Sequence, residues 1–267
     1  MRYAIITDIH GNTHALDAIF ADIDQRGDID QYLFLGDYCG IGYDPVGVLE
    51  RIVHLPNAHF IRGNVDRYVA FHQSPEPSIE AVEANPKLAT ALAEVQRGFG
   101  WTSGAIMQAS KTGNFDYWSW LQNLPLEYRF EMQNGKQALC VHASPDDDNS
   151  EGLYPEQSDD VLRGYQQGAQ ADLILVGHTH VPHQRTVDDV HWVNVGSAGN
   201  PLQSNLDKPD LRACYGILDT GHDGYAISMY RVEYDVQAVI EAFSSWDYPS
   251  RAYPLLFYHG RKMPNWL

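Results

Sequence analysis

The stretch that decides the fold stands at the start of the chain, which reads Ala4-Ile5-Ile6-Thr7-Asp8-Ile9-His10-Gly11-Asn12. The apolar run predicts a buried strand, and the strand stops at a carboxylate and an imidazole two residues apart. Side chains at positions i and i+2 of an extended chain point to the same side, so Asp8 and His10 can reach one point in space. A metal ion could obtain its first two ligands in this way, although a polar strand end is the simpler interpretation of one such pair.

The composition is that of a globular protein. The 267 residues suffice for one large domain or two ordinary ones, and 44% of them are hydrophobic. No apolar run approaches the roughly 18 residues of a membrane span, and the start of the chain turns polar too soon for a signal peptide. The odd number of cysteines (Cys39, Cys140 and Cys214) argues against a disulfide framework. We therefore expect a cytoplasmic protein that does not associate with membranes.

The charge balance excludes one class of partner. The formal net charge is −17, and only 18 Lys and Arg residues are spread over the chain. A protein that binds nucleic acid stably needs a basic patch, so no such binding is expected. An anionic substrate would be repelled at long range but could bind where divalent cations reverse the local field.

Strand and helix alternate in the first half of the chain, and strands dominate the second half. This order predicts a layered α/β fold in a single domain, 1–267, with a helical insertion at about 67–123 and a C-terminal arm at about 247–267. The aromatic residues of the insertion are expected to pack in a core, with a lid over a site as the alternative. The arm is expected to pack on its own domain, and Asp146-Asp147-Asp148 is expected to be a solvated loop. The strands expected are 4–7, 31–35, 58–62, 126–132, 137–141, 172–176, 190–195, 213–219 and 225–234, and the helices are 13–26, one from Pro45, 156–168 and 235–246.

Five of these strands end in a possible metal ligand. The ligands are Asp8 and His10, Asp37, Asn64, His142, and His178 and His180, with a glycine just before the ligand at positions 36, 63 and 177. Because ligand sites lie at the carboxyl ends of strands in open α/β sheets, these side chains should converge. A mixed set of oxygen and nitrogen ligands suits manganese, which we favour, or iron, zinc, nickel or cobalt. Seven ligands suit two ions if one carboxylate bridges them, and such a pair can hold a hydroxide nucleophile for phosphoryl displacement.

The same motifs resemble those of the calcineurin-like metallophosphoesterases, in order and rough spacing. The first motif and Gly196-Ser197-Ala198-Gly199-x-Pro201 are similar to the small prokaryotic phosphodiesterase branch. The resemblance implies a four-layer α-β-β-α sandwich of two mixed sheets flanked by helices. It also implies two ligand groups that share Asp37. The first group is Asp8, His10, Asp37 and His180, and the second group is Asp37, Asn64, His142 and His178.

One position departs from the family pattern. Many members carry a histidine directly after the Asn64 position, and that histidine protonates the leaving group, whereas this chain has Val65. General acid catalysis is typically worth about 10²–10⁴-fold, so its loss favours substrates with stable leaving groups, such as phosphodiesters. His14 is the nearby substitute acid, although a surface histidine is the simpler interpretation. Cys39 could line the site or be a buried structural thiol, and Arg62 could contact a phosphate or neutralise Asp66.

The sequence therefore predicts a binuclear metal-dependent phosphoesterase for a small phosphorylated substrate, with Asp37, Asn64 and His142 as catalytic residues. Phosphodiester hydrolysis is favoured. The alternatives are a nucleotide or dinucleoside-polyphosphate hydrolase, a phosphomonoesterase, and a non-catalytic metal-binding scaffold like the retromer subunit of the same superfamily. The oligomeric state stays open between monomer and dimer.

Overall fold

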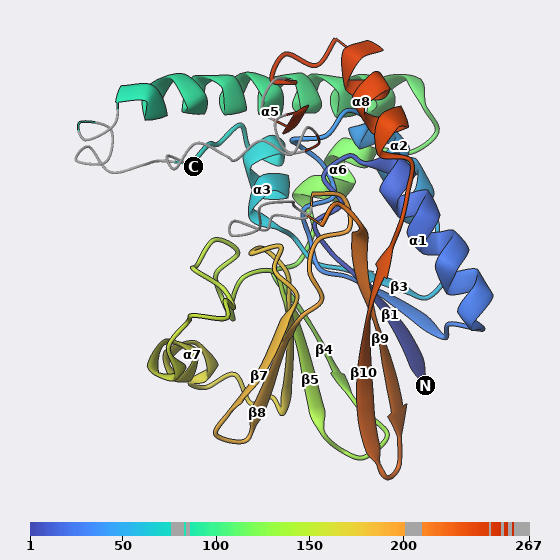
Figure 1. Cartoon of the computed structure of the whole chain (residues 1–267), viewed down its shortest axis with the longest axis vertical. Coiled ribbons are helices and arrows are strands. Elements are labelled where there is room, and N and C mark those ends of the chain that lie inside the picture. The colour runs from blue at the N-terminus through green and yellow to red at the C-terminus, as the bar shows by residue number, and fades with distance from the viewer. Residues whose placement is uncertain are drawn as a thin grey trace.

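Two five-stranded mixed sheets pack face to face in the computed structural model (Figure 1). The structure describes residues 1–75, 83, 86–200, 210–245, 247–251, 254–255 and 258. The first sheet has the order β10-β9-β1-β2-β3, and the second has the order β4-β5-β6-β8-β7. The strands of the first sheet are β1 (Arg2–Ile6), β2 (Gln31–Phe34), β3 (Ala58–Phe60), β9 (Ala213–Gly221) and β10 (Gly224–Val232). Those of the second sheet are β4 (Glu127–Glu131), β5 (Gln137–Val141), β6 (Leu173–Val176), β7 (His183–Val187) and β8 (Val190–Asn194).

Parallel strands form the centre of each sheet. In the first sheet β1, β2 and β3 are parallel, and in the second sheet β5, β6 and β8 are parallel. Their carboxyl ends point toward the same end of the sandwich, which is the upper end in Figure 1. The loops that follow these strands therefore meet where ligand sites form in such sheets.

Helices cover the outer faces of the sandwich. The described helices are α1 (Thr13–Arg26), α2 (Pro45–Ile52), α3 (Asn64–Ala70), α5 (Pro86–Thr112), α6 (Tyr117–Gln122), α7 (Asp159–Gln166) and α8 (Val236–Ser245). Local sequence fixes where several of them begin. Asn12 Oδ1 accepts a hydrogen bond from Ala15 N at the start of α1, and Pro45 follows the capping residue Asp44 at the start of α2.

Alternation along β1 divides the apolar side chains into layers. Ile5 faces the core between the two sheets, together with Leu33 of β2 and Leu175 of β6. Ile6 faces the opposite side, where it joins the core under α1, α2, α3, α5 and α6. Leu162 of α7 belongs to a third cluster on the outer face of the second sheet. These layers confirm the predicted α-β-β-α sandwich.

The predicted insertion is helical in its described part, but its boundary differs. The helix α3 begins at Asn64, three residues before the predicted start at 67. The aromatic side chains of this region pack in the core, because Phe99 and Tyr117 are buried and Trp118 and Trp120 lie against the same cluster. The core interpretation is therefore supported over the lid.

Part of the predicted C-terminal arm can be followed. Tyr258 is buried, donates a hydrogen bond to the Gly199 carbonyl at 3.0 Å and accepts one from Asn12 Nδ2 at 3.2 Å. This residue of the arm therefore lies against the loop before α1 and against Gly199. Residues 246, 252–253, 256–257 and 259–267, and also Pro201 of the predicted motif, lie outside the described residues.

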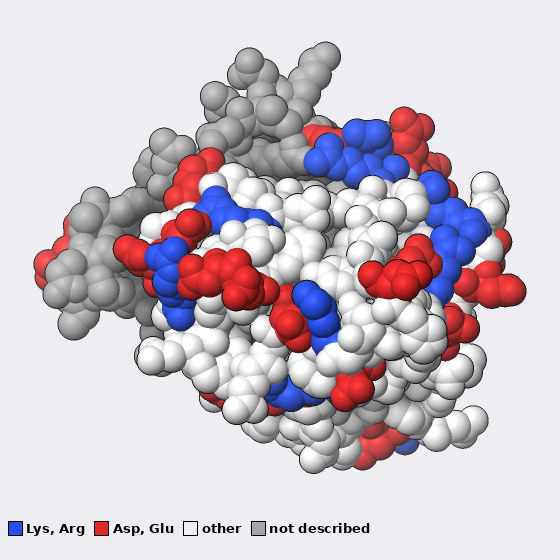
Figure 2. All heavy atoms as spheres, turned by 90° about the horizontal axis from the view of Figure 1, so that it is seen from below, with Lys and Arg blue, Asp and Glu red and all other residues white. Residues whose placement is uncertain are grey.

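Figure 2 shows the molecule of Figure 1 from below, and this face carries acidic and basic side chains side by side. Lys and Arg side chains do not gather into one patch on this face (Figure 2).

The thiols of Cys39, Cys140 and Cys214 are free and buried. Among the described helices, none combines the length and the apolar character that a membrane span requires.

Candidate metal centre

Six of the seven predicted ligands lie in loops that follow strands, and Asn64 is the first residue of α3. The backbone amides of Asp8 and His10 donate to the carbonyls of Gly36 and Asp37, both at 3.0 Å, so the loops after β1 and β2 are joined. In the second sheet, Gly177 N donates to the His142 carbonyl at 2.8 Å, which joins the loops after β5 and β6. The convergence expected from the strand ends is therefore present.

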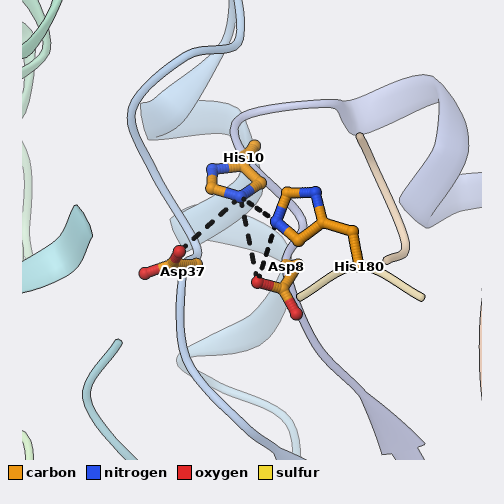
Figure 3. A group of neighbouring side chains, drawn as sticks. All are labelled: Asp8, His10, Asp37 and His180. Carbon is orange, nitrogen blue, oxygen red and sulfur yellow. Dashed lines mark hydrogen bonds and ion pairs between the residues drawn. The ribbon is translucent and has the colours of Figure 1, made fainter. Parts of the chain in front are cut away.

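The first ligand group is compact and buried. His180 Nε2 lies 3.2 Å from Asp8 Oδ1 and 3.1 Å from His10 Nε2, and His10 Nε2 lies 3.6 Å from Asp37 Oδ2 (Figure 3). One ligand atom from each of these four residues lies within 4.8 Å of the others. Such a spacing fits atoms that share one metal ion.

The second ligand group extends from Asp37 to the other side. Asn64 Oδ1 lies 3.0 Å from His142 Nε2 and 3.2 Å from His178 Nδ1. His142 Nε2 lies 3.4 Å from Asp37 Oδ2. The same carboxylate oxygen of Asp37 thus faces imidazoles of both groups. Its other oxygen accepts a hydrogen bond from Val65 N at 2.9 Å, which fixes the orientation of the carboxylate.

Five of these ligand residues have a strained backbone. Asp8, His10, Asp37, His178 and His180 have φ angles between 48° and 68°. Residues other than glycine seldom adopt this left-handed conformation, and such strain gathers at functional sites. Contacts with the surrounding loops must hold each of these residues in this conformation. The conformation directs their side chains toward the centre.

Hydrogen bonds orient two of the imidazole rings. His142 Nδ1 donates to the Leu35 carbonyl at 2.7 Å, and His180 Nδ1 donates to the Asn200 carbonyl at 2.6 Å. Each ring therefore carries a proton on Nδ1 and turns Nε2 toward the centre, where a neutral ring would present its lone pair to a cation. A metal-binding histidine is typically held in this way.

Burial and charge set the protonation of the ligands. Burial lowers the pKa values of His10 and His178 to about 4, so both rings are neutral near pH 7. Burial also acts to lower the pKa of His142, but the carboxylates of Asp37 and Asp8 outweigh it and raise that pKa to about 10. The carboxylates thus draw a positive charge into the centre, which a metal cation would supply instead.

Close approach to the centre requires glycine at all three predicted positions, since a Cβ atom at Gly36 would collide with the Gly63 backbone and with His142 Nδ1. A Cβ atom at Gly177 would collide with Thr7 Oγ1 and Asp8 Oδ2, and one at Gly63 would collide with the Asp37 side chain. These contacts explain why glycine stands before the ligand at all three strand ends.

The sequence interpretation missed the role of Asp66. Its carboxylate accepts hydrogen bonds from three backbone amides, those of Asp37 at 2.7 Å and of Tyr38 and Gly63 at 3.0 Å. Asp66 therefore joins the ligand loop after β2 to the start of α3. The spacing could have revealed it, because an acid three residues after the first capping position commonly bonds back to that position.

The three candidate substrate residues have different surroundings. His14 lies on α1 beside Tyr43, with ring centroids 5.9 Å apart. Cys39 is buried, its thiol donates to Asp66 Oδ1 at 3.4 Å, and burial raises its pKa. The structural interpretation of Cys39 is therefore supported. Arg62 binds Asp148 through Nε at 3.2 Å, and Asp66 binds backbone amides, so the alternative in which Arg62 neutralises Asp66 is not supported.

The acidic loop is only partly solvated. Asp146 and Asp147 are exposed, but Asp148 is buried and binds Arg62 and Arg67. The prediction of a solvated loop is wrong for Asp148, because two arginines distant in the sequence compensate its charge.

Comparison with known proteins gives the relatives of this chain. The model of the calcineurin-like phosphoesterase superfamily domain matches residues 1–223, which include all seven predicted ligands. An uncharacterized protein of Methanocaldococcus jannaschii is 32% identical over 254 residues, 89% of this chain and 90% of its own. A hypothetical protein of Pyrococcus horikoshii OT3 has a similar structure, with a TM-score of 0.75 and 21% identity over 98% of this chain and 99% of its own. For a metallophosphoesterase of Sphaerobacter thermophilus, the TM-score is 0.64 and the identity 24%, over 91% of this chain and 93% of its own.

Proposed function

Because the chain belongs to the calcineurin-like phosphoesterase superfamily, we propose that it is a binuclear phosphohydrolase that prefers small phosphodiesters. The family and the compact first ligand group together make the protein a metal-dependent phosphoesterase. The observation that carries the count of two is the position of Asp37 Oδ2. It lies 3.6 Å from His10 Nε2 and 3.4 Å from His142 Nε2, so one oxygen serves both ligand groups.

Each ligand group would hold one ion, and manganese is the metal we favour. Bound ions would activate a water molecule and neutralise charge on the phosphoryl group. The protein itself fixes the ligands before any metal arrives. Val65 N holds one oxygen of Asp37, and the carbonyls of Leu35 and Asn200 hold His142 and His180. Little rearrangement is then needed when metal and substrate bind.

The surroundings of Val65 support the preference for phosphodiesters. Val65 is only 6% exposed and belongs to the apolar cluster that includes Phe99. The position of the usual acid therefore provides neither a proton nor a polar contact for the leaving group. A phosphodiester with a stable leaving group should suffer least from this loss.

The proposal is tested with manganese-loaded protein and aryl phosphates. A bis-aryl diester should be hydrolysed with a higher kcat/KM than the matching monoester. Within a series of diesters, the rate should fall steeply as the leaving-group pKa rises, because nothing protonates the leaving group. A flat dependence, or a clear preference for the monoester, would contradict the proposal.

The Asp37→Ala variant tests the metal centre directly. Removing an oxygen shared by both groups should lower hydrolysis by at least about 10²-fold, beyond the 10–100-fold typical of residues that only support ligands. The exposed Asp24 on α1 provides the matched control, since Asp24→Ala should keep full activity. Full activity of Asp37→Ala would refute the assignment.

The compartment and the substrate class belong to the same proposal. Three free and buried thiols favour a reducing compartment such as the cytoplasm. Metal ions would allow an anionic substrate to approach a protein of net charge −17.

A further inference from the structure

Side chains of the β3–α3 segment hold the loop that follows β5. The Asp148 carboxylate, in a side chain that is only 5% exposed, accepts hydrogen bonds from Arg62 Nε at 3.2 Å and from Arg67 Nη2 at 2.8 Å. Next to it, the Tyr68 hydroxyl donates to Asn149 Oδ1 at 2.9 Å. We call these five residues the Asp148 clamp. A buried carboxylate is stable only when it is paired, so charge as well as hydrogen bonding holds the clamp together.

The clamp joins two ligand segments from different sheets. Arg62 and Arg67 stand on either side of Asn64 in the chain, and Asp148 follows His142 in the loop after β5. The strands β3 and β5, which lead into these segments, belong to the first and second sheets. Asn64 Oδ1 and His142 Nε2 face each other across this junction at 3.0 Å. Their separation therefore depends on the contacts that join the two segments.

We propose that Asp148 is a positioning residue for the second ligand group. Through Arg62 and Arg67 it fixes Asn64 opposite the two histidines of that group. The inference rests on the proposed two-metal function. The first ligand group depends less on the clamp, because backbone hydrogen bonds such as Asp8 N to the Gly36 carbonyl join its loops. Loss of Asp148 should therefore weaken one metal site and spare the other.

The experiment compares Asp148→Asn with a control in the same loop. Asp146 is exposed and has a φ of 63°, which asparagine also tolerates, so Asp146→Asn removes the same charge without touching the clamp. Each protein is loaded with Mn²⁺, and elemental analysis counts the ions per chain. Electron paramagnetic resonance reports the spin coupling of an ion pair, and circular dichroism of the metal-free protein reports the fold.

Wild-type protein and Asp146→Asn should hold two coupled ions. Asp148→Asn should keep one ion, lose the coupled signal and bind the second ion at least tenfold more weakly. Arg67 donates to Asp148 through both Nε, at 3.0 Å, and Nη2, at 2.8 Å. If Asp148→Asn does not fold, Arg67→Lys keeps the positive charge but loses this pair of hydrogen bonds, and it should also weaken binding of the second ion.

Three results would overturn the inference. The first is wild-type affinity for both ions in the clamp variants, and the second is an equal loss of both ions from a folded variant. The third is wild-type protein that holds only one ion, which would also refute the proposed two-metal function. The first two results leave that function intact, so the two failures can be told apart.

Discussion

Asp66 accepts hydrogen bonds from the backbone amides of Asp37, Tyr38 and Gly63, and also from the thiol of Cys39. Four donors around one carboxylate require both of its oxygens to act as acceptors. Burial and the nearby charge of Asp37 raise the pKa of Asp66 to about 7, while hydrogen bonds from the Gly63 and Asp37 amides act in the opposite direction. The position of a metal ligand thus depends on an acid that is not itself a predicted ligand.

The Asp66→Asn variant should measure this dependence. An amide group places a donor where the carboxylate had an acceptor, so at least one buried N–H or S–H donor loses its partner. The free energy of unfolding should fall by about 2 kcal/mol, as measured by urea denaturation of the metal-free protein. The exposed substitution Asp24→Asn should change it by less than about 0.5 kcal/mol. Equal stability of the two variants would contradict the role of Asp66.

Single residues differ in how far the sequence reveals them. The seven predicted ligands lie close together in the structure, and they could be singled out because each follows an apolar strand in the sequence. Asp148 could not, because its partner Arg62 lies 86 residues away and a run of three acids looks solvated by itself. Only the folded structure places the positive charges of Arg62 and Arg67 next to Asp148.

At the scale of elements, the glycines near the strand ends decide how closely the loops approach. Gly177 follows β6, and the space that its Cβ would need is filled by Thr7 and Asp8 at the end of β1. Gly104 lies within α5, is exposed, and has no atom within 4 Å of the place a Cβ would take. Replacing glycine with alanine should therefore have opposite effects on the stability of the protein at the two positions.

We expect Gly177→Ala to destabilise the protein and Gly104→Ala to stabilise it. At Gly177 the added methyl group must push β6 away from β1, which should cost about 1–3 kcal/mol of unfolding free energy and lower the metal content. At Gly104 alanine restricts the unfolded chain and favours the helix, which should add about 0.5–1 kcal/mol. Urea denaturation of both variants checks the signs, and a stable, fully metal-loaded Gly177→Ala would contradict the close approach.

Elements whose own sequence has strong apolar periodicity could be predicted from the sequence. Elements that form by pairing with a neighbouring strand could not. The helix α1 matches the predicted range 13–26 because its apolar residues recur at helical spacing and Asn12 caps it. The strand β7 was missed because His183–Val187 is mostly polar, and it becomes a strand by pairing with β8 at the edge of the sheet. Tertiary pairing supplied what the local sequence lacks.

At the scale of the whole molecule, the candidate centre lies where the two sheets meet. Within each ligand group, Asp and Asn ligands come from the first sheet and at least one histidine comes from the second. A bound ion would therefore tie the two sheets together. Because unfolding separates the ligands, an ion that binds only the folded chain must stabilise it.

Metal removal should thus lower the melting temperature of the wild-type protein. An ion at 100 times its Kd contributes about 2.7 kcal/mol, and each kcal/mol shifts Tm by roughly 2–4 °C for a chain of this size, so chelation should lower Tm by about 5–10 °C for each ion removed. The Asp37→Ala variant lacks the oxygen that faces both ligand groups, so chelation should hardly change its Tm. Asp24→Ala should respond as the wild type does. Calorimetry with and without chelator checks this, and an equal shift in wild-type protein and Asp37→Ala would mean that the ions bind elsewhere than between the two sheets.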